Sequence, residues 1–288
     1  MKILILGQNS YICNCFSEYA KKYNFDITMI SVRDNTWKSA DFSSYDSVLC
    51  PIGIAHVSTD PSMEQKYYEV NRDLSVEIAK KAKSDGCKQF IFFSSMIVYG
   101  KDLPLGNKFL IDTNTKMIPE NFYGRSKLEA ENLLSAIEDE KFKVAKVRIP
   151  MVYGPNCKGN FPKLLKIARK MPFCPDINNQ RSMIYIDNLC EFFCKLILSR
   201  NGGVYHPQNI EYVSTKEIIQ TAAIYFNHNI HFTKIFNPLI KFASKKIGII
   251  NRIFGTKVYD KSLSPDIENY NVVNFEDSIK YCAEAFIK

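Results

Sequence analysis

Two kinds of segment alternate along the first half of the chain. Short apolar runs predict strands at Lys2–Leu6, Asp26–Val32, Asp46–Ile52, Lys88–Ser95 and Lys143–Ile149. Longer stretches with apolar residues at helical spacing predict helices from the turn after Gly7 to about Lys22, and at Ser62–Lys83 and Asn121–Glu140. Since strands that alternate with helices form parallel sheets, the pattern predicts an α/β fold with a Rossmann-type, doubly wound parallel sheet.

The pattern becomes less regular after the fifth of these strands. Helices are predicted at Phe161–Lys170, Ile186–Ser199 and Lys216–Phe226, with a strand-like run at Gly203–Tyr212. We therefore expect a Rossmann-type domain in residues 1–150 and mainly a smaller C-terminal α/β lobe in residues 151–288.

The composition is that of an ordinary globular protein. Of the 288 residues 46% are apolar, which is enough to bury a core. No apolar run reaches the roughly 18 residues that a membrane-spanning helix needs, and the N-terminus lacks the features of a signal peptide. We expect a cytoplasmic protein without stable membrane insertion.

The net charge of +8 is spread over scattered lysines without an arginine-rich tract. We therefore expect no nucleic-acid partner, and an anionic small-molecule substrate suits the charge. The segment Leu239–Lys257 is basic and amphipathic, which is typical of contact with a membrane surface. We favour instead a helix packed on the substrate lobe with solvated lysines.

The nine cysteines form no C-x-x-C pair, and the four histidines are not spaced beside them as ligands. A metal site is therefore not expected. A reducing compartment suits the cysteines best.

The turn after the first predicted strand is a candidate cofactor-binding turn. In the pattern G-x-x-G-x-x-G only Gly7 is a glycine, and the small residues Ser10 and Cys13 take the later positions. The backbone of such a turn, here including Tyr11 and Ile12, can approach a pyrophosphate at the start of a helix. A plain structural turn is the alternative.

The end of the second predicted strand bears on the choice of cofactor. An NAD-preferring enzyme usually has a carboxylate there, which binds the ribose 2′-hydroxyl. This chain has Ser31, with Arg33 two residues further on. Arg33 could pair with a 2′-phosphate, which favours NADP, and the alternative is a solvated surface arginine.

A tyrosine and a lysine four residues apart form a candidate acid–base pair. Tyr123 and Lys127 lie on one face of a predicted helix, where an ammonium lowers the pKa of a nearby phenol. A second pair, Tyr212 and Lys216, spans a predicted helix cap and does not share a helical face. Ser95 ends the apolar strand before Tyr123, and parallel sheets place reactive groups at such strand ends.

Seven stretches together carry a family resemblance: Gly7–Cys13, Ile54–Val57, Tyr68–Asn71, Ser94–Gly100, Tyr123–Lys127, Arg148–Pro155 and Arg181–Asn188. Over essentially its whole length the chain resembles an extended short-chain dehydrogenase/reductase of the NAD-dependent epimerase/dehydratase family, which acts on nucleotide sugars. The resemblance implies NADP(H) or NAD(H) as cofactor and a UDP-linked sugar as substrate. It implies a dinucleotide-binding Rossmann domain in residues 1–150, to which residues 183–200 return, and mainly a nucleotide-sugar-binding lobe in residues 151–288. A homodimer is an open possibility.

The resemblance also implies roles for individual residues. Tyr123 would be the catalytic acid–base, and Lys127 would lower its pKa and contact the cofactor. Ser95 would bond the sugar oxygen that undergoes redox chemistry, and Asn71 would support the cofactor side of the site.

Two further residues would bind the substrate. Arg181 resembles the arginine that clamps the nucleotide diphosphate, with a surface ion pair as the alternative. Asn160, at the start of a predicted helix, resembles a nucleotide-binding asparagine.

Departures from the family pattern narrow the activity. A 4,6-dehydratase carries an Asp-Glu pair after the position of Ser95, where this chain has Met96 and Ile97. Many 4-epimerases have an asparagine at the position of Met151. We therefore favour a C4 ketoreductase for a UDP-linked sugar, with a UDP-hexose or UDP-HexNAc 4-epimerase as the alternative. A non-catalytic nucleotide-binding sensor is the second alternative.

Overall fold

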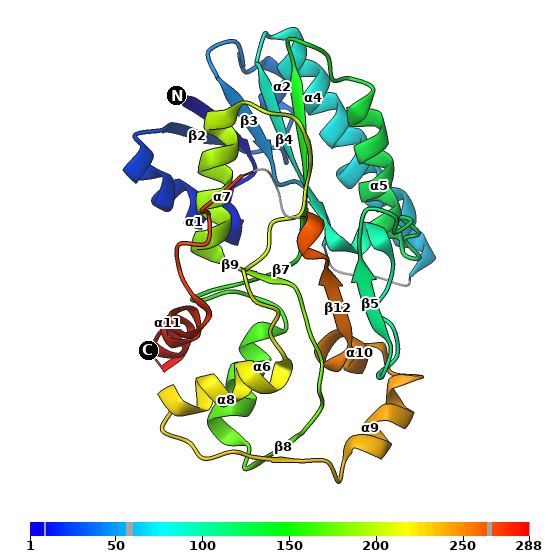
Figure 1. Cartoon of the computed structure of the whole chain (residues 1–288). Coiled ribbons are helices and arrows are strands. Elements are labelled where there is room, and N and C mark those ends of the chain that lie inside the picture. Colours follow the sequence, from blue (N-terminus) through cyan, green and yellow to red (C-terminus); the bar gives the residue numbers. More distant parts are fainter. Residues whose placement is uncertain (9, 56–59, 264–266, 288) are drawn as a thin grey trace.

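A central parallel sheet of six strands forms one half of the molecule (Figure 1). The computed structural model describes residues 1–8, 10–55, 60–263 and 267–287. The strands of this sheet are β1 (Lys2–Leu6), β2 (Asp26–Ile30), β3 (Ser47–Cys50), β4 (Gln89–Ser95), β6 (Lys143–Ile149) and β10 (Gly203–Tyr205). Their order across the sheet is β10-β6-β4-β3-β1-β2, and every neighbouring pair is parallel. The Rossmann-type sheet predicted from the sequence is confirmed.

Helices cover both faces of this sheet. They are α1 (Tyr11–Tyr19), α2 (Thr36–Ser39), α3 (Glu64–Tyr67), α4 (Leu74–Ser84), α5 (Phe122–Ser135) and α7 (Ile186–Ser199). Successive residues of a strand point to opposite faces. In β4, accordingly, Ile91 and Phe93 join the core under α1 and α7, whereas Phe90 and Phe92 join the core under α4 and α5. This burial on both faces explains why β4 is apolar throughout.

The long helix predicted at Ser62–Lys83 contains a change of helical type. Between α3 and α4 the chain forms a π-helix at Tyr68–Asp73. A π-helical turn holds one extra residue and occurs often at functional sites. This turn contains Asn71, which is fully buried.

The other half of the molecule is built from helices and short strand pairs. The helices are α6 (Phe161–Lys170), α8 (Thr215–Tyr225), α9 (Asn237–Ser244), α10 (Gly248–Phe254) and α11 (Phe275–Ile287). The pairs are β7 (Met151–Tyr153) with β9 (Met183–Tyr185), β8 (Phe173–Pro175) with β11 (His231–Thr233), and β5 (Lys108–Ile111) with β12 (Thr256–Tyr259). Helix α8 packs between α6 and α11 (Figure 1).

One predicted strand is shorter in the structure, and another strand was not predicted. The strand-like run Gly203–Tyr212 is a strand only as far as Tyr205, where β10 forms the edge of the central sheet. Strand β5 leaves the sheet half and pairs with β12, far along the chain. Helix α7 lies against α1, on the sheet half of the molecule (Figure 1).

Among the described residues, no helix is long and apolar enough to cross a bilayer. In the same part of the chain, no group of three or more His, Cys, Asp or Glu is arranged to hold a metal ion. All nine cysteines are free thiols.

Gly154 lies where the two halves meet, between β7 and α6. A methyl group at this position would overlap the side chain of Ile186 and lie 2.5 Å from the Tyr11 hydroxyl. We expect Gly154→Ala to lower the free energy of unfolding by about 2 kcal/mol, because overpacking a filled site forces its neighbours apart. Urea denaturation measures the loss.

Gly248, the first residue of α10, is the matched control. A methyl group there meets no atom within 4 Å. Gly248→Ala should be neutral or slightly stabilising, because alanine favours a helix more than glycine does. Equal losses in the two variants would contradict the close packing at Gly154.

Candidate active site

Two adjoining cavities, of about 330 and 290 Å³, lie at the carboxyl ends of the central strands. The strand order reverses between β1 and β3, which is where open parallel sheets bind their ligands. The first cavity lies around the ends of β1, β2 and β3, and the second around the ends of β4 and β6. They share the residues Ser10, Pro51 and Gly53.

The first cavity has the features of a dinucleotide site. Gly7 has a φ of +153°, and a methyl group there would meet Pro51 at 3.2 Å. Ser10 precedes α1, but its hydroxyl makes no capping bond to the helix. The first amides of a helix carry no intrahelical bond and attract anions. These residues therefore fit the pyrophosphate of a dinucleotide.

Among the predicted residues of the glycine turn, the side chains differ in what they contact. Ser10 and Ile12 line the second cavity. The side chain of Tyr11 does not line either cavity. Its hydroxyl donates a hydrogen bond to the carbonyl oxygen of Pro155, 2.9 Å away. The prediction that Tyr11 binds the cofactor therefore finds no support in its side chain, which instead ties α1 to the loop after β7.

Ser31 and Arg33, which follow β2, both line the first cavity. The Ser31 hydroxyl accepts a hydrogen bond from the backbone N–H of Arg33, at 3.2 Å. Among the described residues that line this cavity there is no aspartate or glutamate. The described residues that line this cavity therefore do not include the carboxylate that usually binds a ribose 2′-hydroxyl.

The second cavity brings together Ser95, Tyr123 and Lys127. Ser95 is the last residue of β4. Tyr123 and Lys127 lie one turn apart on α5, which begins at the cap Asn121, whose side-chain oxygen accepts a hydrogen bond from the Gly124 amide at 2.8 Å. Lys127 is the one charged side chain among the described residues that line this cavity.

Lys127 is held by main-chain oxygens. Its ammonium donates hydrogen bonds to the carbonyl oxygens of Ile52 and Phe93, each at 2.8 Å, and lies 4.4 Å from the centre of the Phe92 ring. Burial lowers the pKa of Lys127 to about 8. The two carbonyls hold the protonated form in place although the side chain is buried.

The pKa of Tyr123 differs from the expectation. Burial raises it above the ordinary value, and a hydrogen bond with Ser95 opposes that effect only in part. The expected lowering by Lys127 is not found, because the ammonium is directed to the carbonyls of Ile52 and Phe93. In this state the Tyr123 phenol is protonated at neutral pH.

Asn71 supports the loop that follows β3. Its side-chain oxygen accepts a hydrogen bond from the Ile54 amide at 2.6 Å, and its amide group donates to Ser126 at 2.9 Å. It thus joins this loop to α5. Ile54 and Ala55 are described, whereas His56 and Val57 of the same predicted motif lie outside the described residues.

The predicted substrate residues Arg181 and Asn160 do not line either of these cavities. The Arg181 guanidinium lies 3.2 Å from a carboxylate oxygen of Asp102, and it also donates to the carbonyl oxygens of Asn251 and Gly255. Its Nε is buried without a partner. Asn160 precedes α6, and its side-chain oxygen accepts a hydrogen bond from the Lys163 ammonium at 3.2 Å.

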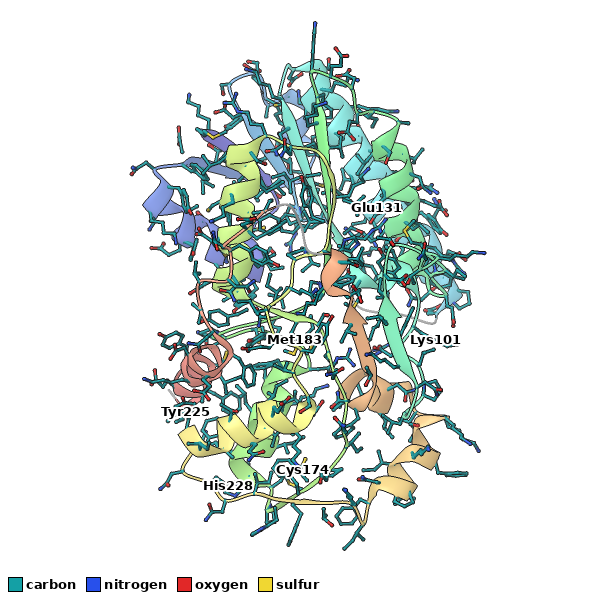
Figure 2. The ribbon with its side chains drawn as sticks, in the orientation of Figure 1. Lys101, Glu131, Cys174, Met183, Tyr225 and His228 are labelled. Carbon is teal, nitrogen blue, oxygen red and sulfur yellow. The ribbon has the colours of Figure 1, made fainter. Side chains whose placement is uncertain are left out.

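The sequence analysis missed a buried polar network beneath the site. Glu131, one turn after Lys127, lies on α5 beside the sheet (Figure 2). It forms an ion pair with Arg148 at 2.7 Å and accepts a hydrogen bond from Ser94. Arg148 donates to the Tyr99 hydroxyl, which is 2.8 Å from His206. Glu131 could have been found from the sequence, because it lies four residues after Lys127 and therefore on the same face of the helix. No local sequence pattern points to His206.

The chain is similar to known proteins over most of its length. Residues 3–210 match the model of the NAD dependent epimerase/dehydratase family. The chain belongs to this family. The resemblance inferred from the sequence is confirmed, and so is the expectation of a nicotinamide dinucleotide as cofactor.

Two relatives are similar to this family member over most of its length. A UDP-glucose 4-epimerase from Vibrio cholerae is 32% identical over 250 residues, covering 81% of this chain and 74% of the relative. An N-acetyl-alpha-D-glucosaminyl-diphospho-ditrans,octacis-undecaprenol 4-epimerase from Escherichia coli O157:H7 is 26% identical over 240 residues, covering 81% and 70%.

Solved structures share the fold of this family member. The UDP-glucuronic acid 4-epimerase from Bacillus cereus in complex with NAD has a TM-score of 0.76 at 17% identity, covering 99% of this chain and 96% of that chain. A dTDP-4-dehydrorhamnose reductase from Clostridium acetobutylicum has a TM-score of 0.74 at 15% identity, covering all of both chains. An epimerase and a reductase therefore share one fold with this chain.

His206 makes the stability of this protein depend on pH. Burial, with a smaller effect of the Arg148 charge, lowers the pKa of His206 to about 3, below the ordinary value of 6.5. As the pH falls below 6.5, the unfolded chain binds a proton that the folded chain excludes. The free energy of unfolding must then fall.

When the pH is lowered from about 7 to about 5.5, we expect the free energy of unfolding of His206→Gln to fall by about 1 kcal/mol less than that of the unmodified protein. Urea denaturation at both pH values measures this difference. His231→Gln, which replaces an exposed histidine, is the control and should follow the unmodified protein. An unchanged pH dependence in His206→Gln would show that His206 is not held neutral.

Proposed function

We propose that the protein is a 4-epimerase that acts on a UDP-linked sugar by reversible oxidation at C4. The observation that carries this proposal is the convergence of Ser95, Tyr123 and Lys127 on one cavity, next to a cavity that fits a dinucleotide. The names of the two curated relatives, both 4-epimerases, support the same reaction.

A bound nicotinamide dinucleotide supplies the hydride acceptor and donor for this chemistry. Gly7 and the first turn of α1 would hold its pyrophosphate, and Asn71 would position the loop beside it. Tyr123 exchanges the proton of the C4 hydroxyl, as a base when the sugar is oxidised and as an acid when the ketone is reduced. Ser95 donates a hydrogen bond to the same oxygen.

Lys127 provides the charge that this proton transfer needs. Tyr123 must lose its proton to act as a base, and burial opposes that loss. The Lys127 ammonium is the cation that lines the same cavity, and a nearby cation stabilises a phenolate. We therefore assign Lys127 a role in stabilising the ionised form of Tyr123 during the reaction.

The substrate side of the site is proposed to lie in the second half of the chain. Residues 1–150 would hold the cofactor, with 183–200 returning to them, and residues 151–288 would form most of the sugar-nucleotide site. Arg181 and Asn160 remain the proposed diphosphate and nucleotide ligands. The buried, unpartnered Nε of Arg181 supports this role, since a bound anion would give it a partner.

A 4-ketoreductase is the second candidate function. Arg33 lines the dinucleotide cavity, and no described residue there supplies a carboxylate. This arrangement tolerates a 2′-phosphate and favours NADPH, the usual supply for a reductase that exchanges its cofactor in each cycle. Met151, which the sequence analysis took to favour a reductase, packs against the hydrophobic core and does not line the second cavity.

The first test of the proposal is Tyr123→Phe. We expect turnover to fall by about 10² to 10⁴, the usual contribution of a general acid–base, while folding and cofactor binding are retained. Tyr212→Phe is the matched control, because the Tyr212 hydroxyl bonds only the carbonyl oxygen of Tyr259 among its described contacts. A larger loss in Tyr212→Phe would contradict the placement of the site.

The second test separates the two candidate reactions. An epimerase regenerates its cofactor in every cycle, so the purified protein should contain tightly bound NAD and interconvert two UDP-hexose C4 epimers without added cofactor. If the protein instead lacks bound NAD and oxidises NADPH when given a UDP-linked 4-keto sugar, it is a reductase. In that event Arg33→Ala should weaken NADPH binding more than NADH binding, because NADH lacks the 2′-phosphate.

A further inference from the structure

The α9–α10 region exposes several apolar side chains. In Figure 1, α9 lies toward the end of the molecule away from the central sheet, and α10 lies between α9 and β12. We call this region the docking surface and define it by six exposed apolar residues: Ile235, Phe236, Leu239, Phe242, Ile247 and Ile249. The side chains of Leu239 and Phe242 are 68% and 65% exposed, and that of Ile235 is 82% exposed. In the segment Leu239–Lys257, Ile253 packs against the core as expected. Leu239 and Phe242 are exposed instead, and Lys257 is buried and not solvated.

The docking surface is also strongly basic. Four lysines and one arginine are exposed on the same segment: Lys234, Lys241, Lys245, Lys246 and Arg252. No aspartate or glutamate occurs between Glu217 and Asp260. Residues 151–259 contain 15 Lys and Arg against 5 Asp and Glu, whereas the rest of the chain contains 23 against 25. The positive charge of the protein is thus concentrated in the part that carries this surface.

Polar contacts hold the two helices in place. The Asn251 side chain of α10 donates to the carbonyl oxygen of Ser244 at the end of α9, at 2.8 Å. At the start of α9, the Asn237 side chain donates to the carbonyl oxygen of Asp176 at 2.8 Å. These asparagines anchor the helices to each other and to the lobe. Leu239 and Phe242 are exposed and take no part in these polar contacts.

We propose that this surface docks the protein onto an anionic phospholipid bilayer. Apolar side chains flanked by lysines are suited to the membrane interface, where the apolar groups enter the headgroup region and the ammonium groups meet lipid phosphates. A second copy of the chain is the less favourable occupant. A twofold dimer would place the same patch on both sides of the interface, so its lysines would face lysines.

The docking surface adjoins the proposed substrate side of the site. The carbonyl oxygens of Asn251 and Gly255, which accept hydrogen bonds from Arg181, lie in α10 and directly after it. If the proposed function holds, docking would therefore keep the substrate lobe next to the membrane. The docking itself does not depend on the proposed reaction.

Vesicle flotation with the full-length protein tests the proposal. We expect binding to vesicles of phosphatidylcholine with phosphatidylglycerol, no binding to phosphatidylcholine alone, and release by high salt. Replacing Lys241, Lys245 and Lys246 together by Gln should weaken binding by about 10²-fold, since each lysine near an anionic surface contributes to attraction. The double variant Leu239→Ser with Phe242→Ser should also lose binding.

Matched controls come from the rest of the surface. The exposed lysines Lys80, Lys88 and Lys141 belong to the sheet half, and their joint replacement by Gln should leave vesicle binding unchanged. Ile224→Ser removes an apolar side chain that is 71% exposed on α8 and should also have no effect. All variants should retain the activity on a water-soluble UDP-sugar, so a failure of docking is distinguishable from a failure of the proposed function.

Three results would overturn the proposal. The first is absence of binding to anionic vesicles, and the second is equal binding by the docking-surface and control variants. The third is a concentration-dependent dimer, seen by analytical ultracentrifugation, that Leu239→Ser with Phe242→Ser dissociates. That result would assign the surface to a second copy of the chain.

Discussion

The burial of the Lys127 ammonium against two main-chain carbonyls is the constraint on which the rest of the site depends. The carbonyls belong to Ile52 and Phe93, so one side chain of α5 joins the end of β4 to the loop after β3. A buried charge is costly unless it is well bonded, and these bonds fix the position of α5. The position of α5 in turn brings Tyr123 to Ser95. Glu131, one turn further along, extends the same arrangement into the core.

The sequence predicts much of the local structure, because local structure follows from short-range patterns, and it also names three candidate residues that line one cavity. Strand β1 and the helices α6 and α7 begin and end at the predicted residues, since each combines a clear apolar period with a turn. Ser95 meets Tyr123 and Lys127 because α5 packs beside the carboxyl end of β4. The pairing of β5 with β12 and the ion pair of Arg181 with Asp102 join residues distant in the chain, and no local period encodes such contacts.

Whether the protein is an epimerase or a reductase is harder to infer than the family to which it belongs. Under the proposed function, epimerisation and ketone reduction would place the same demand on Tyr123 and Ser95, namely proton transfer and hydrogen bonding at a C4 oxygen. They differ in how firmly the cofactor is held between half-reactions, which is a property of the whole binding surface and not of one motif. The fold does not separate them either, because an epimerase and a reductase superpose on this chain about equally well.

The π-helical turn at Tyr68–Asp73 has a consequence for how this family member can vary. Each residue of an α-helix rotates the chain by about 100°, so one extra residue in the turn resets the direction of every side chain after it. Asn71 faces the active-site loop while Ile78 and Ala79 face the core. Deleting one residue from the turn would leave a regular helix in which these two sets of side chains could not both point inward. The length of this segment therefore sets the direction of Asn71 relative to the core positions of α4.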